Sequence, residues 1–299
     1  MKPLITVIIP VYNTEKELPR CINSVITRSY KNLEILLVDN VSSDNSSEIC
    51  DRYSLIDSRI KVMHLDKSGV SHARNEGLRV SSGEYISFID SDDWIEEDFY
   101  EMLISKIQDC SIAIVGYKLL DESGMIINTV ELIEDKFVLN QENFINVECM
   151  VKNSALGFAW NKLYKREIVE KVRFPQLQSR EDMVFNLSLL KTNLRIKLIG
   201  QYTGYNWVQR ANSIIHKADS SNINIANELS NSLLNINWKF NKRSKIVVYN
   251  YIMKVFLMDI IMKDIVTNIN LNKAEKKELC KLLGGSIKIY ISLKMTVSI

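Results

Sequence analysis

Hydrophobic runs and amphipathic segments alternate along the N-terminal third of the chain. Residues 4–11 form an almost continuous apolar and β-branched run, and residues 33–39 form a second one. Runs of this kind are typical of strands that are buried on both faces of a parallel sheet. Between them, apolar side chains in residues 15–29 recur at helical spacing. The pattern therefore predicts a strand, a helix and a second buried strand.

The same alternation continues to the end of a predicted fourth strand. The next predicted elements are a helix at 43–53, a strand at 60–65, a helix at 71–80 and a strand at 84–89. This order predicts an α/β fold with a mostly parallel central sheet flanked by helices. Later segments predict helices at 98–108, 140–152, 161–171 and 181–191, a strand at 112–117 and a hairpin at 121–135. Beyond about residue 220 we expect a helical C-terminal extension.

Polar side chains follow three of these predicted strands. Tyr12-Asn13 follows the first strand, Asp39-Asn40 ends the second, and the acidic cluster Asp90-Ser91-Asp92-Asp93 follows the fourth. Ligands of open α/β sheets bind outside the carboxyl ends of the strands. We therefore expect the three groups to share one site.

The acidic cluster is compatible with two roles. Mg²⁺ and Mn²⁺ prefer oxygen ligands, and Mg²⁺ commonly uses one or two carboxylates together with substrate phosphates. Aspartate and serine are also good N-terminal helix caps. Taken alone, the cluster leaves a metal site and a helix cap both open.

Composition and charge narrow the class of protein. Of 299 residues, 46% are hydrophobic, which suffices for a sizeable core, and the net charge of +2 does not predict a nucleic-acid partner. Residues 200–299 nevertheless carry 14 Lys and Arg against 6 Asp and Glu. This basic excess either faces anionic lipid or a phosphorylated substrate, or it is a solvated helical face.

Cysteine usage and hydropathy predict a cytoplasmic protein. The five cysteines are scattered and form no C-x-x-C pair, so neither a zinc site nor a disulfide framework is expected. Free thiols fit a reducing compartment. The sequence shows no secretory signal and no run of 18 apolar residues.

Four ordered motifs resemble those of family 2 glycosyltransferases, which adopt the GT-A fold. Residues 83–94 resemble the D-x-D strand of that family, residues 6–13 its opening strand and loop, and residues 69–77 its Ala-Arg-Asn motif. Trp160-Asn161-Lys162-Leu163-Tyr164 is similar to a segment of members that build bacterial capsules and exopolysaccharides. The resemblance implies a catalytic GT-A domain at 1–215, with a nucleotide-sugar-binding half at 1–105 and an acceptor half at 106–215, followed by a helical region at 216–299.

The resemblance also implies which residues bind the nucleotide sugar. These are Pro10, Tyr12, Asp39, Asn40, Arg74, Asp90 and Ser91. The Tyr12 ring is expected to stack on the pyrimidine, and Arg74 to contact the diphosphate or support the aspartates. The family usually has Asp-Asp where this chain has Asp39-Asn40. An asparagine can accept from N3–H and donate to O4, which does not separate uracil from thymine.

The metal, the catalytic base and the acceptor site are implied in the same way. Asp92 is the expected ligand of Mn²⁺ or Mg²⁺, with His216 as a weaker candidate, and Asp93 is expected to cap the next helix. Asp182 is the expected base, since inverting transfer needs a carboxylate to deprotonate the acceptor hydroxyl. Acceptor contacts are expected from Trp160, Glu181 and Arg210, although Trp160 could instead pack in the core, and Arg210 could touch the pyrophosphate.

The implied reaction is inverting transfer of a hexose or N-acetylhexosamine from a UDP-sugar. The expected acceptor is a saccharide linked to undecaprenyl diphosphate, in capsule or exopolysaccharide synthesis. A dTDP-sugar (rhamnosyl-type) transferase and a non-catalytic glycosyltransferase-like partner subunit are the alternatives. A sugar nucleotidyltransferase is disfavoured, because residues 10–13 lack the glycines of a phosphate loop.

The C-terminal region carries a broad apolar face at residues 245–269. It could pack on the catalytic domain, form a homodimer contact, or lie on the inner face of the cell membrane as a peripheral contact. The sequence leaves these three possibilities open.

Overall fold

The computed structural model describes residues 2–132, 137–138, 157–177, 180–189 and 194–210. The chain divides into two compact units. The first comprises residues 1–138, 158–176 and 194–211, and the second includes α7 (Glu181–Leu189). Each unit is described by itself below.

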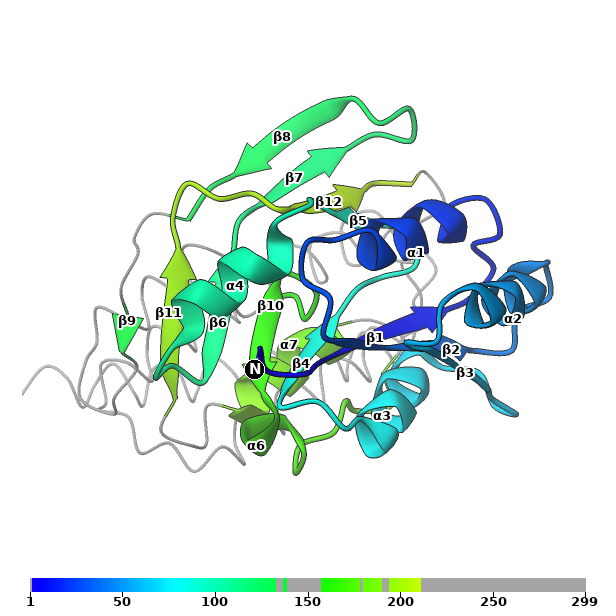
Figure 1. The fold of residues 1–299 in the computed structure, drawn as a ribbon, viewed down its shortest axis with the longest axis horizontal. Coiled ribbons are helices and arrows are strands. Elements are labelled where there is room, and N and C mark those ends of the chain that lie inside the picture. Colours follow the sequence, from blue (N-terminus) through cyan, green and yellow to red (C-terminus); the bar gives the residue numbers. More distant parts are fainter. Residues whose placement is uncertain (1, 133–136, 139–156, 178–179, 190–193, 211–299) are drawn as a thin grey trace, which may run out of the picture. The chain divides into compact units, whose positions relative to one another are not determined.

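An eight-stranded sheet forms the centre of the first unit (Figure 1). In sheet order its strands are β3 (Ile60–His64), β2 (Leu33–Asp39), β1 (Ile5–Val11), β4 (Tyr85–Phe88), β10 (Lys162–Lys165), β6 (Ile112–Val115), β11 (Arg195–Ile199) and β9 (Phe137–Val138). The first four strands are mutually parallel, β10 is antiparallel to both of its neighbours, and β11 runs parallel to β6. The parallel strands predicted from the hydrophobic runs are therefore confirmed.

Helices cover both faces of the parallel part of this sheet. The helices of the first unit are α1 (Leu18–Ile26), α2 (Ser46–Ile56), α3 (Val70–Val80), α4 (Phe99–Ile107) and α6 (Arg166–Val169). Figure 1 shows α1 and α2 on one face of β1, β2 and β3, with α3 on the other. Most of the apolar stripe of α1 is fully buried in the same core cluster as β1, and Ile26 packs against that cluster while partly buried. Burial of such stripes is the main stabilising term, about 25 cal/mol per Å² of apolar surface.

A smaller four-stranded sheet carries the segment that reaches the acidic cluster. In sheet order its strands are β5 (Trp94–Ile95), β12 (Tyr205–Val208), β7 (Tyr117–Leu120) and β8 (Ile126–Val130). The chain passes from β6 of the large sheet into β7 through Gly116. A Cβ atom there would lie 2.3 Å from the carbonyl oxygen of Val130, so only glycine fits the crossing. The predicted strand 112–117 is thus two strands in two sheets.

One predicted helix is wrong. Residues 161–171 form β10 and then the single turn of α6, not one helix. The side chains of 162–164 are all buried, and β10 pairs with β4 and β6. β10 is a short strand buried on both faces. Over so few residues, its pattern of apolar positions cannot be distinguished from helical spacing.

Several predicted segments lie outside the described residues. They are the helix at 140–152, the end of the hairpin at 133–135, the helical region 216–299 with His216, and the apolar face at 245–269. Among the residues that are described, no helix is long and apolar enough to cross a membrane.

Gly77 sets how closely α3 can approach β1, and α3 carries Arg74. A Cβ atom at Gly77 would lie 2.5 Å from Cγ2 of the buried Ile8. We expect Gly77→Ala to reduce the free energy of unfolding by about 1–3 kcal/mol through overpacking, despite alanine's better helix propensity.

Chemical denaturation checks this prediction. Arg79→Ala is the matched control, because it alters an exposed side chain of the same helix. A Gly77→Ala protein as stable as the wild type would contradict the predicted packing role.

Candidate active site

The carboxyl ends of β1 and β2 bring the first two polar groups together. Val11 is opposite Asp39 in the parallel register, and the Asn40 backbone N–H donates to the Val11 carbonyl at 2.8 Å. Pro10 lies within β1, opposite Val38. Tyr12 follows directly and is 51% exposed. The ring predicted to stack on a base is therefore available at the same sheet edge as Asp39.

Asn40 is held by a backbone amide. Its Oδ1 accepts from the Gly69 N–H at 2.7 Å, and Gly69 has a φ of +141°, which favours glycine. A carboxylate in this place could accept the same hydrogen bond. This bond fixes the orientation of the amide, so its nitrogen can donate to a ligand while Oδ1 keeps one lone pair. That Asn40 both accepts from and donates to a base stays a prediction.

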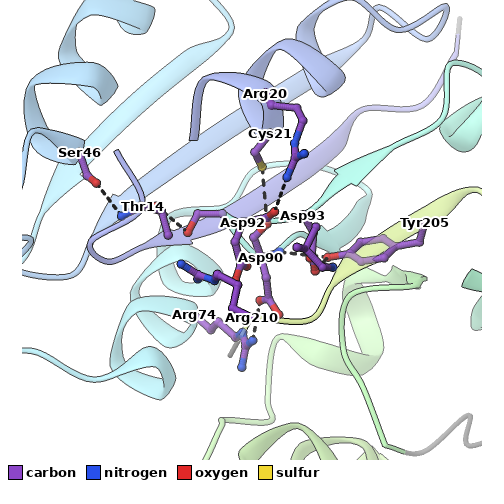
Figure 2. Close-up of polar contacts among 12 residues, drawn as sticks. Thr14, Arg20, Cys21, Ser46, Arg74, Asp90, Asp92, Asp93, Tyr205 and Arg210 are labelled. Atoms are coloured by element: carbon purple, nitrogen blue, oxygen red, sulfur yellow. Dashed lines mark hydrogen bonds and ion pairs between the residues drawn. The ribbon is translucent and has the colours of Figure 1, made fainter. Parts of the chain in front are cut away.

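Arg74 of α3 reaches the acidic cluster. Its Nη2 donates to Asp90 Oδ1 at 2.8 Å (Figure 2). Its guanidinium lies 5.3 Å from the centre of the Phe174 ring. The neighbouring Asn75 fixes the backbone of Phe174 by two hydrogen bonds, of 2.8 and 2.9 Å. A buried guanidinium beside a carboxylate makes a strong charge-assisted bond and orients Asp90.

Asp92 faces two arginines. Its carboxylate is paired with Arg210, which follows β12, and its backbone carbonyl accepts from Arg20 at 3.2 Å. Burial raises the pKa of Asp92 above its ordinary value, although the charge of Arg210 acts in the opposite direction. The structure therefore places Arg210, predicted to contact the acceptor or the pyrophosphate, against the D-x-D aspartate.

Asp93 does not cap the following helix, which corrects the prediction. It is 1% exposed and accepts hydrogen bonds from the Val208 N–H at 2.8 Å and the Tyr205 hydroxyl at 2.7 Å. β5 intervenes between Asp93 and α4, which begins at Phe99. Burial, together with the charges of Asp92 and Asp90, raises the pKa of Asp93 well above its ordinary range.

Three residues that sequence reasoning missed complete the polar cluster in Figure 2. Thr14 donates to the buried Ser91 at 3.0 Å, Arg20 stacks on Trp94 at 3.8 Å, and the Tyr205 hydroxyl accepts from the Asp90 N–H at 3.2 Å. None of them lies near the cluster in sequence. No local sequence pattern therefore assigned them to the cluster.

Trp160 lies in an aromatic cluster. It is 3% exposed, and its ring stacks on Tyr205 and Phe158 with centroid distances of 4.3 and 4.5 Å. This placement favours core packing over the predicted contact with a sugar ring.

Glu181 and Asp182 are the first residues of α7, in the second unit, and both are buried. A helix N-terminus stabilises carboxylates through its partial positive charge. Their roles in catalysis and acceptor binding stay predictions.

The acidic cluster fits a cation only in part. Among the described residues, no group of three or more His, Cys, Asp or Glu side chains could enclose a metal ion. Asp92 offers one carboxylate, which suits a cation that takes its other ligands from phosphate and water. Arg210 is paired with Oδ2 of that carboxylate here, so a cation bound to Asp92 would lie beside this guanidinium.

Comparison with known proteins defines the class. The sequence profile of Glycosyl transferase family 2 matches residues 6–173, more than half of the chain, and the protein belongs to this family.

Individual relatives agree with this assignment. The chain is 41% identical over 191 residues to the glycosyltransferase GlyA of Streptococcus pneumoniae, covering 61% of this chain and 27% of GlyA. It is 32% identical to the Escherichia coli UDP-Glc:α-D-GlcNAc-diphosphoundecaprenol β-1,3-glucosyltransferase WfgD, covering 64% of this chain and 71% of WfgD. The chain spans 27–60% of the length of several curated relatives.

A solved structure confirms the predicted GT-A fold. TarS residues 1–349 of S. aureus, crystallised with UDP-GlcNAc, superimposes with a TM-score of 0.74 at 20% identity. The match covers 95% of this chain and 80% of that one.

The Tyr205 hydroxyl is the link between Asp93 and the Asp90 backbone. We expect Tyr205→Phe to lower the free energy of unfolding by about 1–3 kcal/mol, because Asp93 and the Asp90 N–H both lose a buried partner. Thermal and chemical unfolding measure this effect.

Tyr53→Phe is the control for the same chemical change. The Tyr53 hydroxyl accepts from the exposed Asn23 amide at 2.9 Å, where water can replace it. If the two substitutions lowered the free energy of unfolding equally, the Tyr205 contacts would have no stabilising role beyond that of an exposed hydroxyl.

Proposed function

We infer that this protein is an inverting glycosyltransferase that takes a hexose or N-acetylhexosamine from a UDP-sugar. The observation that carries the proposal is the convergence of Tyr12, Asp39-Asn40 and the pair Arg74–Asp90 at one edge of a parallel sheet. The exposed ring of Tyr12 suits the base, and the polar pair Asp39-Asn40 suits the hydrogen-bonding edge of that base. The buried Arg74 guanidinium beside the carboxylates suits the charged diphosphate of a nucleotide.

In this proposal each part of the site contacts one part of the donor. Tyr12 stacks on the base, and Asp39 and Asn40 bind its polar edge. Asp90, oriented by Arg74, contacts the ribose or the sugar, while the buried Ser91 keeps the loop in place through Thr14. Residues 1–105 thus bind the nucleotide sugar, and residues 106–215 supply the acceptor half.

Asp92 is the residue that would hold Mn²⁺ or Mg²⁺. A bound divalent cation neutralises negative charge on a departing diphosphate. Arg210, which is paired with Asp92 here, would contact the anionic diphosphate beside the cation. Asp92 and Arg210 therefore determine together how the leaving group is stabilised.

Asp182 is proposed as the base that removes the proton of the acceptor hydroxyl. The hydroxyl oxygen then attacks the anomeric carbon from the face opposite the leaving diphosphate, which inverts the configuration. The WfgD name specifies an undecaprenol-diphosphate-linked acceptor, so we propose a lipid-linked saccharide, reached at the inner face of the membrane.

A donor screen separates this function from the alternatives. UDP- and dTDP-sugars are incubated with the protein, with and without Mn²⁺, and hydrolysis and transfer are followed. UDP-sugar turnover supports the proposal, and turnover of dTDP-sugars alone supports a rhamnosyl-type enzyme. Lack of binding and turnover with every donor supports a non-catalytic partner.

Asp182→Asn tests the base. The variant keeps the shape of the side chain but cannot accept the proton, so we expect kcat to fall about 10²–10⁴-fold. UDP binding, measured by calorimetry, should stay close to that of the wild type. Near-native transfer by this variant would exclude Asp182 as the base.

Asp92→Asn tests the metal ligand. We expect EDTA to weaken UDP binding to the wild type, and added Mn²⁺ to restore it, because the cation links carboxylate and diphosphate. The variant should lose most of this Mn²⁺ dependence. Asp109→Asn, which alters an exposed aspartate paired with Arg195, should keep it. If EDTA left the affinity for UDP unchanged, metal-dependent binding would be refuted.

A further inference from the structure

His64 lies behind the polar pair that is proposed to read the base. It is the last residue of β3 and is opposite Asp39 in the parallel register. Its Nδ1 lies 3.1 Å from Asp39 Oδ2, and its Nε2 lies 3.1 Å from Asp51 Oδ1 of α2. The ring therefore bridges a buried carboxylate and an exposed one.

The surroundings of His64 favour a ring that donates from both nitrogens. The hydrogen bond to Asp39, followed by that to Asp51, raises the pKa of His64 above its usual value, while partial burial opposes this. Ser47 Oγ lies 3.1 Å from the same Nδ1 and can share its proton. Burial raises the pKa of the nearby Cys50 to about 12, so its thiol adds no charge.

Two contacts fix the Asp39 carboxylate. Oδ2 accepts from His64, and Oδ1 accepts from the Ser42 backbone N–H at 3.2 Å. A carboxylate held at both oxygens cannot rotate, but each oxygen keeps a second lone pair for a ligand. Without His64, the Ser42 contact alone would orient it.

Asn40 is fixed independently, through the bond from the Gly69 N–H to its Oδ1. At the end of β2 the fixed acceptor Asp39 is thus followed in sequence by Asn40, whose amide nitrogen can donate. Uracil and thymine offer the complementary pair, an N3–H beside a carbonyl. Cytosine has an unprotonated N3 and an amino group, so its edge opposes both groups.

We propose that His64 is a positioning residue for the donor nucleotide, which orients Asp39 to accept from the N3–H of a uracil or thymine base. The proposal rests on the proposed function, because it requires that Tyr12 and Asp39-Asn40 bind a base. It assigns base discrimination to a side chain that does not itself touch the base.

A purely structural role for His64 is disfavoured by its exposure. Its side chain is 44% exposed and that of Asp51 is 61% exposed. Exposed ion pairs contribute little to stability, typically less than about 1 kcal/mol. The contact with the buried Asp39 is therefore the one whose loss has a local consequence.

Substitutions that replace one ring nitrogen at a time test the proposal. Asparagine places an amide N–H near the position of Nδ1 and can still donate to Asp39, whereas glutamine reaches toward the position of Nε2 and Asp51. The probes are uridine and cytidine, which lack phosphates and so do not engage Arg74, Asp92 or a metal. Binding is measured by NMR titration of the full-length protein, with UDP-sugar kinetics in parallel.

We expect His64→Ala to weaken uridine binding about tenfold, as loss of one charge-assisted hydrogen bond would. His64→Gln should resemble alanine, and His64→Asn should restore binding to within about threefold of the wild type. The preference for uridine over cytidine should fall in the alanine variant, and KM for the donor should rise while kcat stays constant. Asp51→Asn should change little.

Several results would overturn the proposal. One is wild-type uridine affinity in His64→Ala. Another is an equal loss of uridine and cytidine binding in the alanine and asparagine variants, accompanied by a lower melting temperature, which would indicate a structural role. If the wild type binds neither uridine nor UDP, the proposed function itself fails, which is distinct from a failure confined to His64.

Discussion

The placement of three aspartates within four residues, one buried and two partly buried, is the constraint on which the site depends. Carboxylates lose hydration at the end of a buried strand, and this is costly unless each one is paired. Asp90 is paired with Arg74, Asp92 with Arg210, and Asp93 with the hydroxyl and backbone of β12. These partners come from two distant parts of the chain, α3 and residues 205–210. The electrostatic requirement of one short segment thereby fixes the positions of α3 and β12.

The same requirement joins the two sheets of the first unit. β4 belongs to the large sheet and β12 to the small one, and the acidic cluster between them receives hydrogen bonds from Tyr205, Val208 and Arg210. The polar site is therefore also part of the framework. Substitutions of these aspartates combine chemical and structural effects, which is why binding and stability have to be measured separately.

Local pattern predicted the parallel half of the fold and the residues at its strand ends. Buried strands have a signal within their own residues, and the sheet edge follows from their direction. The pattern failed where the deciding contacts are distant in sequence. Residues 162–165 form a strand because β4 and β6 flank them. Asp93 points inward because it bonds to the hydroxyl of Tyr205, which lies more than a hundred residues later in the sequence. The roles of Glu181 and Asp182 rest on resemblance alone.

The stack of Trp160 on Tyr205 changes how mutagenesis of this family segment has to be interpreted. The ring of Trp160 supports the aromatic face of Tyr205, whose hydroxyl is bonded to Asp93 and the Asp90 backbone. Removing the indole would loosen the phenol ring and, through it, the loop that carries the aspartates. A loss of activity after such a change would therefore not identify a sugar-binding platform. It would report a defect in the scaffold, transmitted through two rings and a hydroxyl.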